Sequence, residues 1–280
     1  MKEISVGEVK IGGNSPLALI AGPCVIEDAQ ECFDIASHLK TLTERLSIPF
    51  IFKSSYDKAN RSSANSYRGP GLEKGLEVLS TIRSKLSVPV LTDVHCRTEV
   101  ERVAQVVDVV QIPAFLCRQT DLVQAVAEKA QVVNVKKGQF LSPWEMKNVT
   151  DKIEAVGNHN IIITERGTSF GYNCLVSDMR AILIMQSYGY PVVFDATHSV
   201  QRPGGLGEAS GGDREFVSCL AMAAVAAGCD GLFVEVHPQP ERALSDAASM
   251  LPLEELPELL EKAVAIREIV NPPKGSEGKA

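Results

Sequence analysis

Short apolar runs alternate with longer amphipathic stretches along this chain. Eight runs are rich in β-branched residues and show little alternation between apolar and polar positions. That pattern is typical of strands buried on both faces of a parallel sheet. These predicted strands occupy residues 17–22, 49–55, 88–94, 109–114, 132–138, 160–167, 191–199 and 231–238.

Helical spacing of apolar residues fills intervals between the runs, most clearly at residues 28–46, 71–86, 213–228 and 253–270. Eight strand–helix units in 280 residues favour an α/β fold of the (β/α)8 TIM-barrel type over an open doubly wound sheet. Residues 4–13 resemble a short β-hairpin that precedes the barrel. We therefore expect one domain over residues 1–280, with the hairpin in 1–14, the barrel in 15–270 and a disordered polar tail in 271–280.

Composition narrows the class of protein. The hydrophobic content is 45% and the charged content 22%, which suits a soluble globular domain. The net charge of −7 argues against a nucleic-acid-binding protein, which usually carries a basic surplus. Seven scattered cysteines form no C-x-x-C pair, and no apolar run approaches the length of about 18 residues that spans a membrane. We expect a reduced, cytoplasmic protein that binds no membrane.

Polar or reactive side chains stand at the carboxyl end of every predicted strand. Barrel enzymes place their chemistry at these ends. One or two such residues are readily explained as buried structural groups, but a full set favours a functional mouth. The residues are Cys24, Lys53, Asp93, Gln111, Lys136, Arg166, Asp195 and Glu235, with His95, His198 and His237 close behind them.

Cations are concentrated around this predicted mouth although the protein is acidic. Lys53, Lys58 and Arg61 lie within nine residues, and Lys136 and Arg166 end two further strands. Arginine binds phosphate or carboxylate through two hydrogen bonds, and lysine acts as a compact point charge. The pattern predicts anionic substrates. We expect the adjacent Lys137 to be a solvated surface lysine.

A candidate metal site emerges from the strand order. Cys24, His198, Glu235 and Asp246 follow the first, seventh and eighth strands, which are neighbours in a closed barrel. Thiolate, imidazole and carboxylate groups are suitable ligands for Zn²⁺, Fe²⁺ or Mn²⁺. A single cysteine after a strand is also commonly a small buried residue. His95 and His237 compete as ligands or as partners of ligands.

The glycine-rich segment at residues 203–212 does not match a nucleotide-binding motif. It fits neither G-x-G-x-x-G nor G-x-x-x-x-G-K, so no nucleotide cofactor is expected. We expect a mobile loop after the seventh strand, either a lid over the mouth or a merely flexible connection.

Several segments resemble the 3-deoxy-D-manno-octulosonate 8-phosphate synthase family. They include AGPCVIE, KSSYDKANRSS, QIPAFLCRQTD, NVKKGQF, TERGTSFGYN, FDATHSVQ and EVHPQPERALSDA, and the resemblance runs from about residue 15 to about residue 270. The segment K-A-N-R-S is specific, because the related erythrose-4-phosphate condensing enzymes of the shikimate route usually carry a K-P-R-T type segment there.

The resemblance implies a homotetrameric (β/α)8 barrel. The implied transferase reaction condenses phosphoenolpyruvate with D-arabinose 5-phosphate and water, for lipopolysaccharide synthesis, and releases inorganic phosphate. Carried over by motif, the residues that hold phosphoenolpyruvate are Lys53, Lys58, Gln111, Ala114, Lys136 and Arg166. Those that contact the pentose phosphate are Asn60, Arg61, Ser62 and Asp93, with Arg61 also a candidate for a neighbouring subunit's site.

Cys24 also places the chain within the family, because members that need no metal carry Asn at this position. The resemblance therefore implies a divalent metal ion held by Cys24, His198, Glu235 and Asp246. The candidate catalytic residues are Lys53, Asp93, His198 and Asp246, and for the last two ligation and proton transfer both remain open.

Three alternatives are kept. In the first, the chain is the erythrose-4-phosphate condensing relative, which differs in the loop at residues 58–63. A Schiff base on Lys53 or Lys136 is the rival mechanism. A non-catalytic sugar-phosphate-binding protein is the alternative from another class, which the convergent cations and metal ligands argue against.

Overall fold

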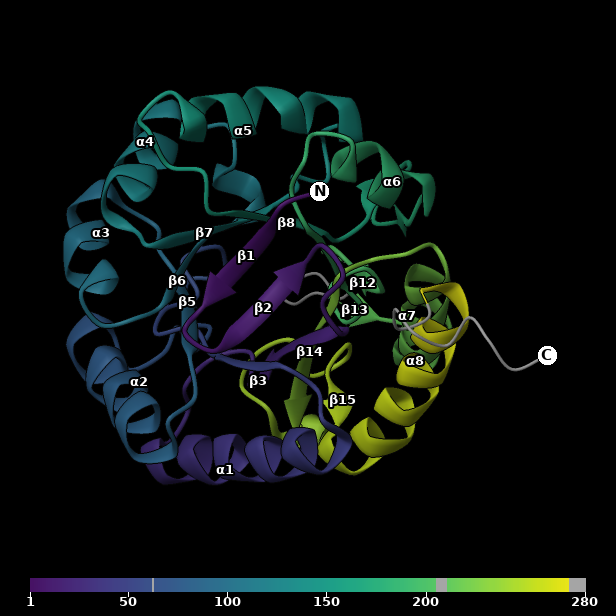
Figure 1. Cartoon of the computed structure of the whole chain (residues 1–280). Coiled ribbons are helices and arrows are strands. Elements are labelled where there is room, and N and C mark those ends of the chain that lie inside the picture. The colour runs from purple at the N-terminus through teal and green to yellow at the C-terminus, as the bar shows by residue number, and fades with distance from the viewer. Residues whose placement is uncertain (62, 205–210, 272–280) are drawn as a thin grey trace.

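A closed ring of eight parallel strands forms the centre of the computed structural model, which describes residues 1–61, 63–204 and 211–271 (Figure 1). Each strand pairs with the next along the ring, and β11 pairs with β14 to close it. The (β/α)8 prediction is therefore confirmed, and each of the eight predicted runs contains one barrel strand. These are β3 (Ala18–Gly22), β4 (Phe50–Lys53), β5 (Val90–Asp93), β6 (Val109–Ile112), β7 (Val132–Lys136), β8 (Ile161–Glu165), β11 (Val192–Asp195) and β14 (Gly231–His237).

Helices surround the ring (Figure 1). The first of them shows why they form where they do, because Asp28 caps it by accepting hydrogen bonds from the backbone N–H groups of Gln30 and Glu31. Its buried residues recur three or four positions apart and face the barrel. The helices are α1 (Ala29–Leu46), α2 (Leu72–Leu86), α3 (Arg97–Ala104), α4 (Thr120–Lys129), α5 (Met146–Glu154), α6 (Arg180–Gln186), α7 (Val217–Ala226) and α8 (Leu256–Val270).

Short elements decorate the loops that follow the strands. Two hairpins, β9 with β10 and β12 with β13, lie after β8 and β11, and β15 extends the pairing of β14. The described residues also form five short 3-10 helical turns. The strands are β9 (Thr168–Ser169), β10 (Leu175–Val176), β12 (Gln201–Arg202), β13 (Gly211–Gly212) and β15 (Leu251–Pro252), and the turns are η1 (Ala114–Leu116), η2 (Pro143–Glu145), η3 (Arg214–Phe216), η4 (Pro240–Arg242) and η5 (Leu253–Glu255).

Two apolar layers explain why the strands show little alternation. An outer layer fills the space between strands and helices, and it includes Leu19, Phe52 and Val133. An inner layer fills the N-terminal part of the barrel interior, with Val109 and Ile162 among its members. Both faces of each strand are therefore buried, and polar residues appear only from the third position of a strand onward, toward its carboxyl end.

The predicted N-terminal hairpin is present as β1 (Glu3–Val6) and β2 (Val9–Gly12). Figure 1 shows it lying across the centre of the ring. Ile4, Val6 and Ile11 are 2% exposed or less and pack with the inner apolar layer. The hairpin closes the N-terminal end of the barrel.

Two expectations fall largely outside the described part of the chain. The tail predicted over residues 271–280 lies there except for its first residue. The predicted glycine-rich loop includes residues 205–210, which also lie outside it. Within the described ranges, no helix is long and apolar enough to cross a membrane.

Candidate active site

The carboxyl ends of the strands surround a cavity of about 450 Å³. Most of the predicted site residues share this cavity although they come from different strand–helix units. A larger hollow of about 690 Å³ beside the β9–β10 hairpin is lined, among the described residues, by none of them. Those that line the 450 Å³ cavity are Lys53, Lys58, Asn60, Arg61, Asp93, Gln111, Ala114, Lys136, Arg166, His198 and Asp246, while Ser62 lies outside the described residues.

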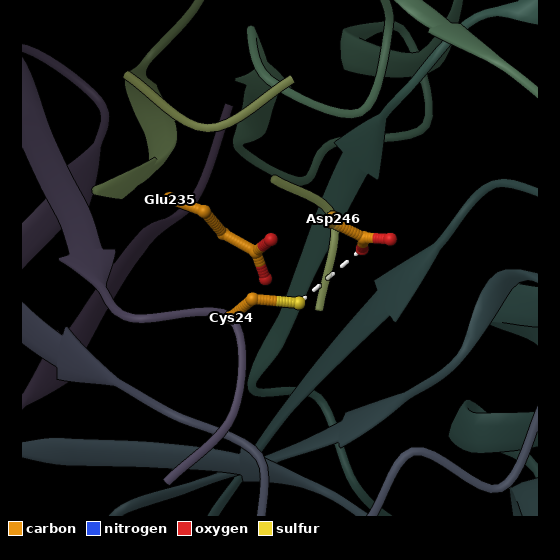
Figure 2. Close-up of side chains that lie close together, drawn as sticks. All are labelled: Cys24, Glu235 and Asp246. Atoms are coloured by element: carbon orange, nitrogen blue, oxygen red, sulfur yellow. Dashed lines mark hydrogen bonds between the residues drawn. The ribbon is translucent and has the colours of Figure 1, made fainter. Parts of the chain in front are cut away.

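Three candidate metal ligands meet below one side of the cavity. Figure 2 shows the side chains of Cys24, Glu235 and Asp246 close together, and one ligand atom of each lies within 4.8 Å of the others. Sγ of Cys24 lies within hydrogen-bond distance of two oxygens, 3.2 Å from Oδ2 of Asp246 and 3.2 Å from Oγ of Ser245. The backbone φ of Asp246 is 49°, a left-handed conformation that costs energy for a residue other than glycine and recurs at functional sites.

His198 completes the group from the loop after β11. Its Nε2 lies 3.6 Å from Oε2 of Glu235 and 3.7 Å from Oδ2 of Asp246. Its Nδ1 lies 2.7 Å from Oδ2 of Asp195. A carboxylate on one ring nitrogen fixes the tautomer and leaves the other nitrogen free to bind a metal. The imidazole is therefore oriented toward the predicted ligands.

The chemistry of this group fits a divalent cation. Burial, together with the charges of Asp246 and Glu235, raises the pKa of the Cys24 thiol well above its usual value. A buried thiol between two carboxylates is poorly placed to ionise by itself, whereas a bound cation favours the thiolate. Thiolate, imidazole and carboxylate form a donor set suited to Zn²⁺, Fe²⁺ or Mn²⁺.

Three of the predicted cations, Lys53, Lys136 and Arg166, lie buried along the cavity wall, each with an anionic or polar partner. Nζ of Lys53 donates to Oε1 of Glu235 at 2.6 Å, and Lys136 forms an ion pair with Asp195. Burial lowers the pKa of Lys136 to about 8, against the opposing effect of Asp195. Arg166 is held differently, because its Nη2 donates to an uncharged amide.

Arg166 donates to Oε1 of Gln201 at 2.7 Å. Its Nη1 is buried and has no hydrogen-bond partner in the described part of the chain. Because an unpaired buried guanidinium nitrogen is costly, an anion in the cavity is its natural partner. Gln201 is absent from the sequence-based predictions. Its place in the FDATHSVQ segment, three residues after His198, is the signal that was available.

Asp93 also lines the cavity and is held by two neighbours. Oγ of Ser55 donates to its Oδ1 at 2.6 Å, and Nε2 of His95 lies 3.0 Å from its Oδ2. Burial raises the pKa of Asp93, but the hydrogen bond from His95 and nearby positive charges outweigh this and lower it well below its usual range. The group is therefore a carboxylate that is able to accept hydrogen bonds from hydroxyl groups.

The two competing histidines do not join Cys24. His95 pairs with Asp93, as just described. His237 belongs to a second, separate group with Glu27 and Glu31. Its Nδ1 accepts a hydrogen bond from the backbone N–H of Gln239, so in the neutral ring the proton lies on Nε2. That nitrogen is then a donor and not a free metal ligand.

Arg61 crosses from the loop after β4 to the loop before β15. Its Nη1 donates to Oγ of Ser245 and its Nη2 to the backbone oxygen of Leu244, both at 2.9 Å. Nη1 also lies 3.9 Å from Oδ1 of Asp246. The guanidinium thus lies in the cavity of its own chain, next to a candidate metal ligand.

The expectation of a solvated Lys137 is wrong, because its side chain is fully buried. Nζ lies 3.6 Å from Oε2 of Glu165 and donates to three backbone oxygens, those of Gly138, Leu141 and Gly167. Side chains alternate along a strand, so Lys136 enters the barrel and Lys137 turns outward. Loop carbonyls there replace water around the ammonium group.

Comparisons with known proteins find named relatives over nearly the whole chain. The chain is 62% identical over 270 residues to the "2-dehydro-3-deoxyphosphooctonate aldolase" of Geotalea uraniireducens (strain Rf4), covering 96% of this chain and 99% of that protein. Proteins of the same name from Geotalea daltonii and Trichlorobacter lovleyi are 59% and 60% identical, with the same coverage. The name is a synonym for 3-deoxy-D-manno-octulosonate 8-phosphate synthase, so the resemblance inferred from the motifs is confirmed.

The erythrose-4-phosphate condensing alternative is supported only at the level of the broader family. The model of the DAHP synthetase I family matches residues 2–271. Because that match covers nearly the whole chain, the protein belongs to the DAHP synthetase I family.

Proposed function

We propose that the chain condenses phosphoenolpyruvate with D-arabinose 5-phosphate and water to give 3-deoxy-D-manno-octulosonate 8-phosphate and inorganic phosphate. One observation carries the proposal. Lys53, Lys136 and Arg166 come from three different strands and line one cavity beside a group of candidate metal ligands. This arrangement suits a small substrate with several negative charges.

Phosphoenolpyruvate carries a carboxylate and a phosphate that repel each other in water. Lys136 and Arg166 neutralise the substrate and orient it, and the unpaired Nη1 of Arg166 gains its hydrogen-bond partner. Charge stabilisation of this kind is worth more in a buried cavity than in water. Holding both substrates in one cavity also converts their encounter into a step within a single complex.

The proposed reaction balances with water as the third reactant. C3 of phosphoenolpyruvate forms a bond to the aldehyde carbon of the pentose, whose oxygen takes up a proton. Water adds its oxygen to C2 and loses a proton. The bond between C2 and the phosphate oxygen then breaks and inorganic phosphate leaves with the electron pair. The C2 hydroxyl gives its remaining proton to the departing phosphate, and C2 becomes a ketone.

Residues around the cavity supply the contacts for the aldose. Asp93 accepts hydrogen bonds from hydroxyl groups, and Asn60 and Arg61 line the same cavity. A divalent ion held by Cys24, His198, Glu235 and Asp246 would supply Lewis-acid polarisation of a substrate or water oxygen. His95 keeps Asp93 ionised and so keeps it an acceptor.

The test is phosphate release from phosphoenolpyruvate on addition of arabinose 5-phosphate, with erythrose 4-phosphate in parallel. We expect turnover with the five-carbon aldose, loss of turnover with dipicolinate, and recovery with a divalent ion. Turnover with erythrose 4-phosphate alone would favour the shikimate-type alternative. Binding of either phosphate without turnover would favour the binding-protein alternative. Borohydride trapping of a substrate on Lys53 or Lys136 would replace the mechanism with a Schiff base.

A homotetramer in the cytoplasm is part of the proposal. Large aromatic side chains gather on the loops after β6, β7 and β8 and are more than half exposed. An apolar surface of this kind is typical of contacts between subunits. Light scattering of the purified chain is expected to give four times the mass of 30.2 kDa. The exposed aromatic residues are Phe115, Phe140, Trp144, Phe170 and Tyr172.

A further inference from the structure

A line of uncharged polar side chains crosses the barrel interior just below the cavity. Gln111, Asn134 and Thr164 lie on the neighbouring strands β6, β7 and β8 and are 5% exposed or less. Gln111 and Asn134 are direct partners in the strand register. Barrel interiors are usually filled by branched apolar residues, and buried polar groups are costly unless they are hydrogen-bonded. Three polar side chains at this level of the barrel are therefore unusual.

The three side chains form a directed chain of hydrogen bonds. Oγ1 of Thr164 donates to Oδ1 of Asn134 at 2.7 Å, and Nδ2 of Asn134 donates to Oε1 of Gln111 at 3.0 Å. Because Thr164 occupies the oxygen of the Asn134 amide, the NH₂ group of that amide faces Gln111. The direction of the second hydrogen bond follows from the first.

One end of this hydrogen-bond chain lies in the cavity. Gln111 lines it, whereas Asn134 and Thr164 do not. Since Oε1 of Gln111 is occupied by Asn134, its NH₂ group is the part of the amide left to face a substrate, and no described residue accepts a hydrogen bond from it. A reversed amide would instead present an oxygen to an anion and bring two NH₂ groups together.

We infer that Asn134 and Thr164 are positioning residues, which hold the carboxamide of Gln111 with its NH₂ group toward the anionic substrate. The inference rests on the proposed function, because it takes phosphoenolpyruvate as that anion. Gln111 itself is the group that contacts the substrate. The two residues behind it act only through the orientation of its amide.

Thr164→Val tests this directly, since valine keeps the shape of threonine and removes the hydroxyl. We expect the Kd for phosphoenolpyruvate, measured by calorimetry on the metal-loaded full chain, to rise about fivefold, the equivalent of one net hydrogen bond. Thr164→Ser keeps the hydroxyl and is expected to retain the original Kd. Thr150→Val is the matched control, because Thr150 is also fully buried and its hydroxyl donates only to the backbone oxygen of Lys147, on α5.

A double-mutant cycle separates positioning from a purely structural role. In a Gln111→Ala background, Thr164→Val is expected to change the Kd no further, because the amide to be oriented is gone. Asn134→Leu removes the next donor and is expected to repeat the rise, which supplies a second route if Thr164→Val does not fold. Independent effects of Thr164→Val and Gln111→Ala that simply add would overturn the inference.

The outcomes also separate the inference from the function on which it rests. If the unaltered chain binds phosphoenolpyruvate and Thr164→Val binds it equally well, the inference fails and the proposed function stands. If the unaltered chain neither binds phosphoenolpyruvate nor turns it over, both fail together.

Discussion

Asp195 contacts both Nδ1 of His198, at 2.7 Å, and the ammonium group of Lys136. One buried carboxylate thus joins the candidate metal ligands to the cations that line the cavity. Burial raises the pKa of Asp195, but His198 and Lys136 outweigh this and lower it well below its usual range. It is therefore ionised and holds both partners in place.

Asp195→Asn keeps the shape of this carboxylate and removes its charge. Because such partners orient the metal-binding imidazole, we expect the affinity for Zn²⁺ or Mn²⁺ to fall about 10- to 100-fold. Competition with a chromogenic chelator measures this without reference to activity. An unchanged metal affinity would show that His198 is oriented by other contacts.

Cys24→Asn is expected to abolish tight metal binding, because an amide is a much poorer ligand than a thiolate. The family resemblance implies that members needing no metal carry Asn at this position, so we expect part of the activity to survive and to resist chelation. Metal content by mass spectrometry and turnover with and without dipicolinate are the two measurements. Cys32→Asn, at a buried cysteine on α1 outside the metal group, is the control for loss of a buried thiol. Full metal content in Cys24→Asn contradicts the ligand assignment.

The pH profile is expected to depend on Lys136. Burial lowers its pKa to about 8, so the ammonium is charged below that pH and is lost as the pH rises through it. We expect kcat/KM for phosphoenolpyruvate, which reports ionisations of the free enzyme, to fall above about pH 8. Lys136→Arg keeps its charge to much higher pH and should remove this limb. The same limb in both proteins would assign it to another group.

Removing one partner of the buried Lys137–Glu165 ion pair is expected to lower the free energy of unfolding. Lys137→Met leaves Glu165 as an unpaired buried carboxylate, and removing one partner of such a pair costs about 3 to 5 kcal/mol. The urea midpoint is therefore expected to fall strongly. Glu165→Gln added to Lys137→Met should recover part of the loss, because no unpaired charge remains. Lys147→Met, at an exposed ion pair on α5, should leave the midpoint nearly unchanged.

The sequence predicted the barrel well because its strands are buried on both faces. The run at residues 160–167, for example, contains β8, and the polar Glu165 and Arg166 mark the point where that strand ends. The same logic brought Cys24, Glu235 and Asp246 into one predicted group, since the ring order of the strands makes β3 and β14 neighbours. The first prediction rests on patterns that are local in sequence, and the second adds the strand order of a closed barrel.

Other features depend on contacts between distant loops and could not be predicted this way. Lys137 is buried because carbonyl groups from residues 138–141 and from Gly167 enclose it. His95 pairs with Asp93, and Gln201 receives Arg166, through side-chain directions that no spacing encodes. A single sequence identifies residues at the mouth, but hydrogen-bond partners are decided by loop conformations.

Among the described residues, the N-terminal hairpin covers the end of the barrel opposite the cavity. With Ile4, Val6 and Ile11 sealing one end of the barrel, the mouth at the other end has to admit both substrates and discharge both products. Inorganic phosphate must leave past the same cations that attracted phosphoenolpyruvate. It therefore competes with the next substrate molecule for binding to those cations. Release of phosphate is therefore coupled to binding of the next phosphoenolpyruvate.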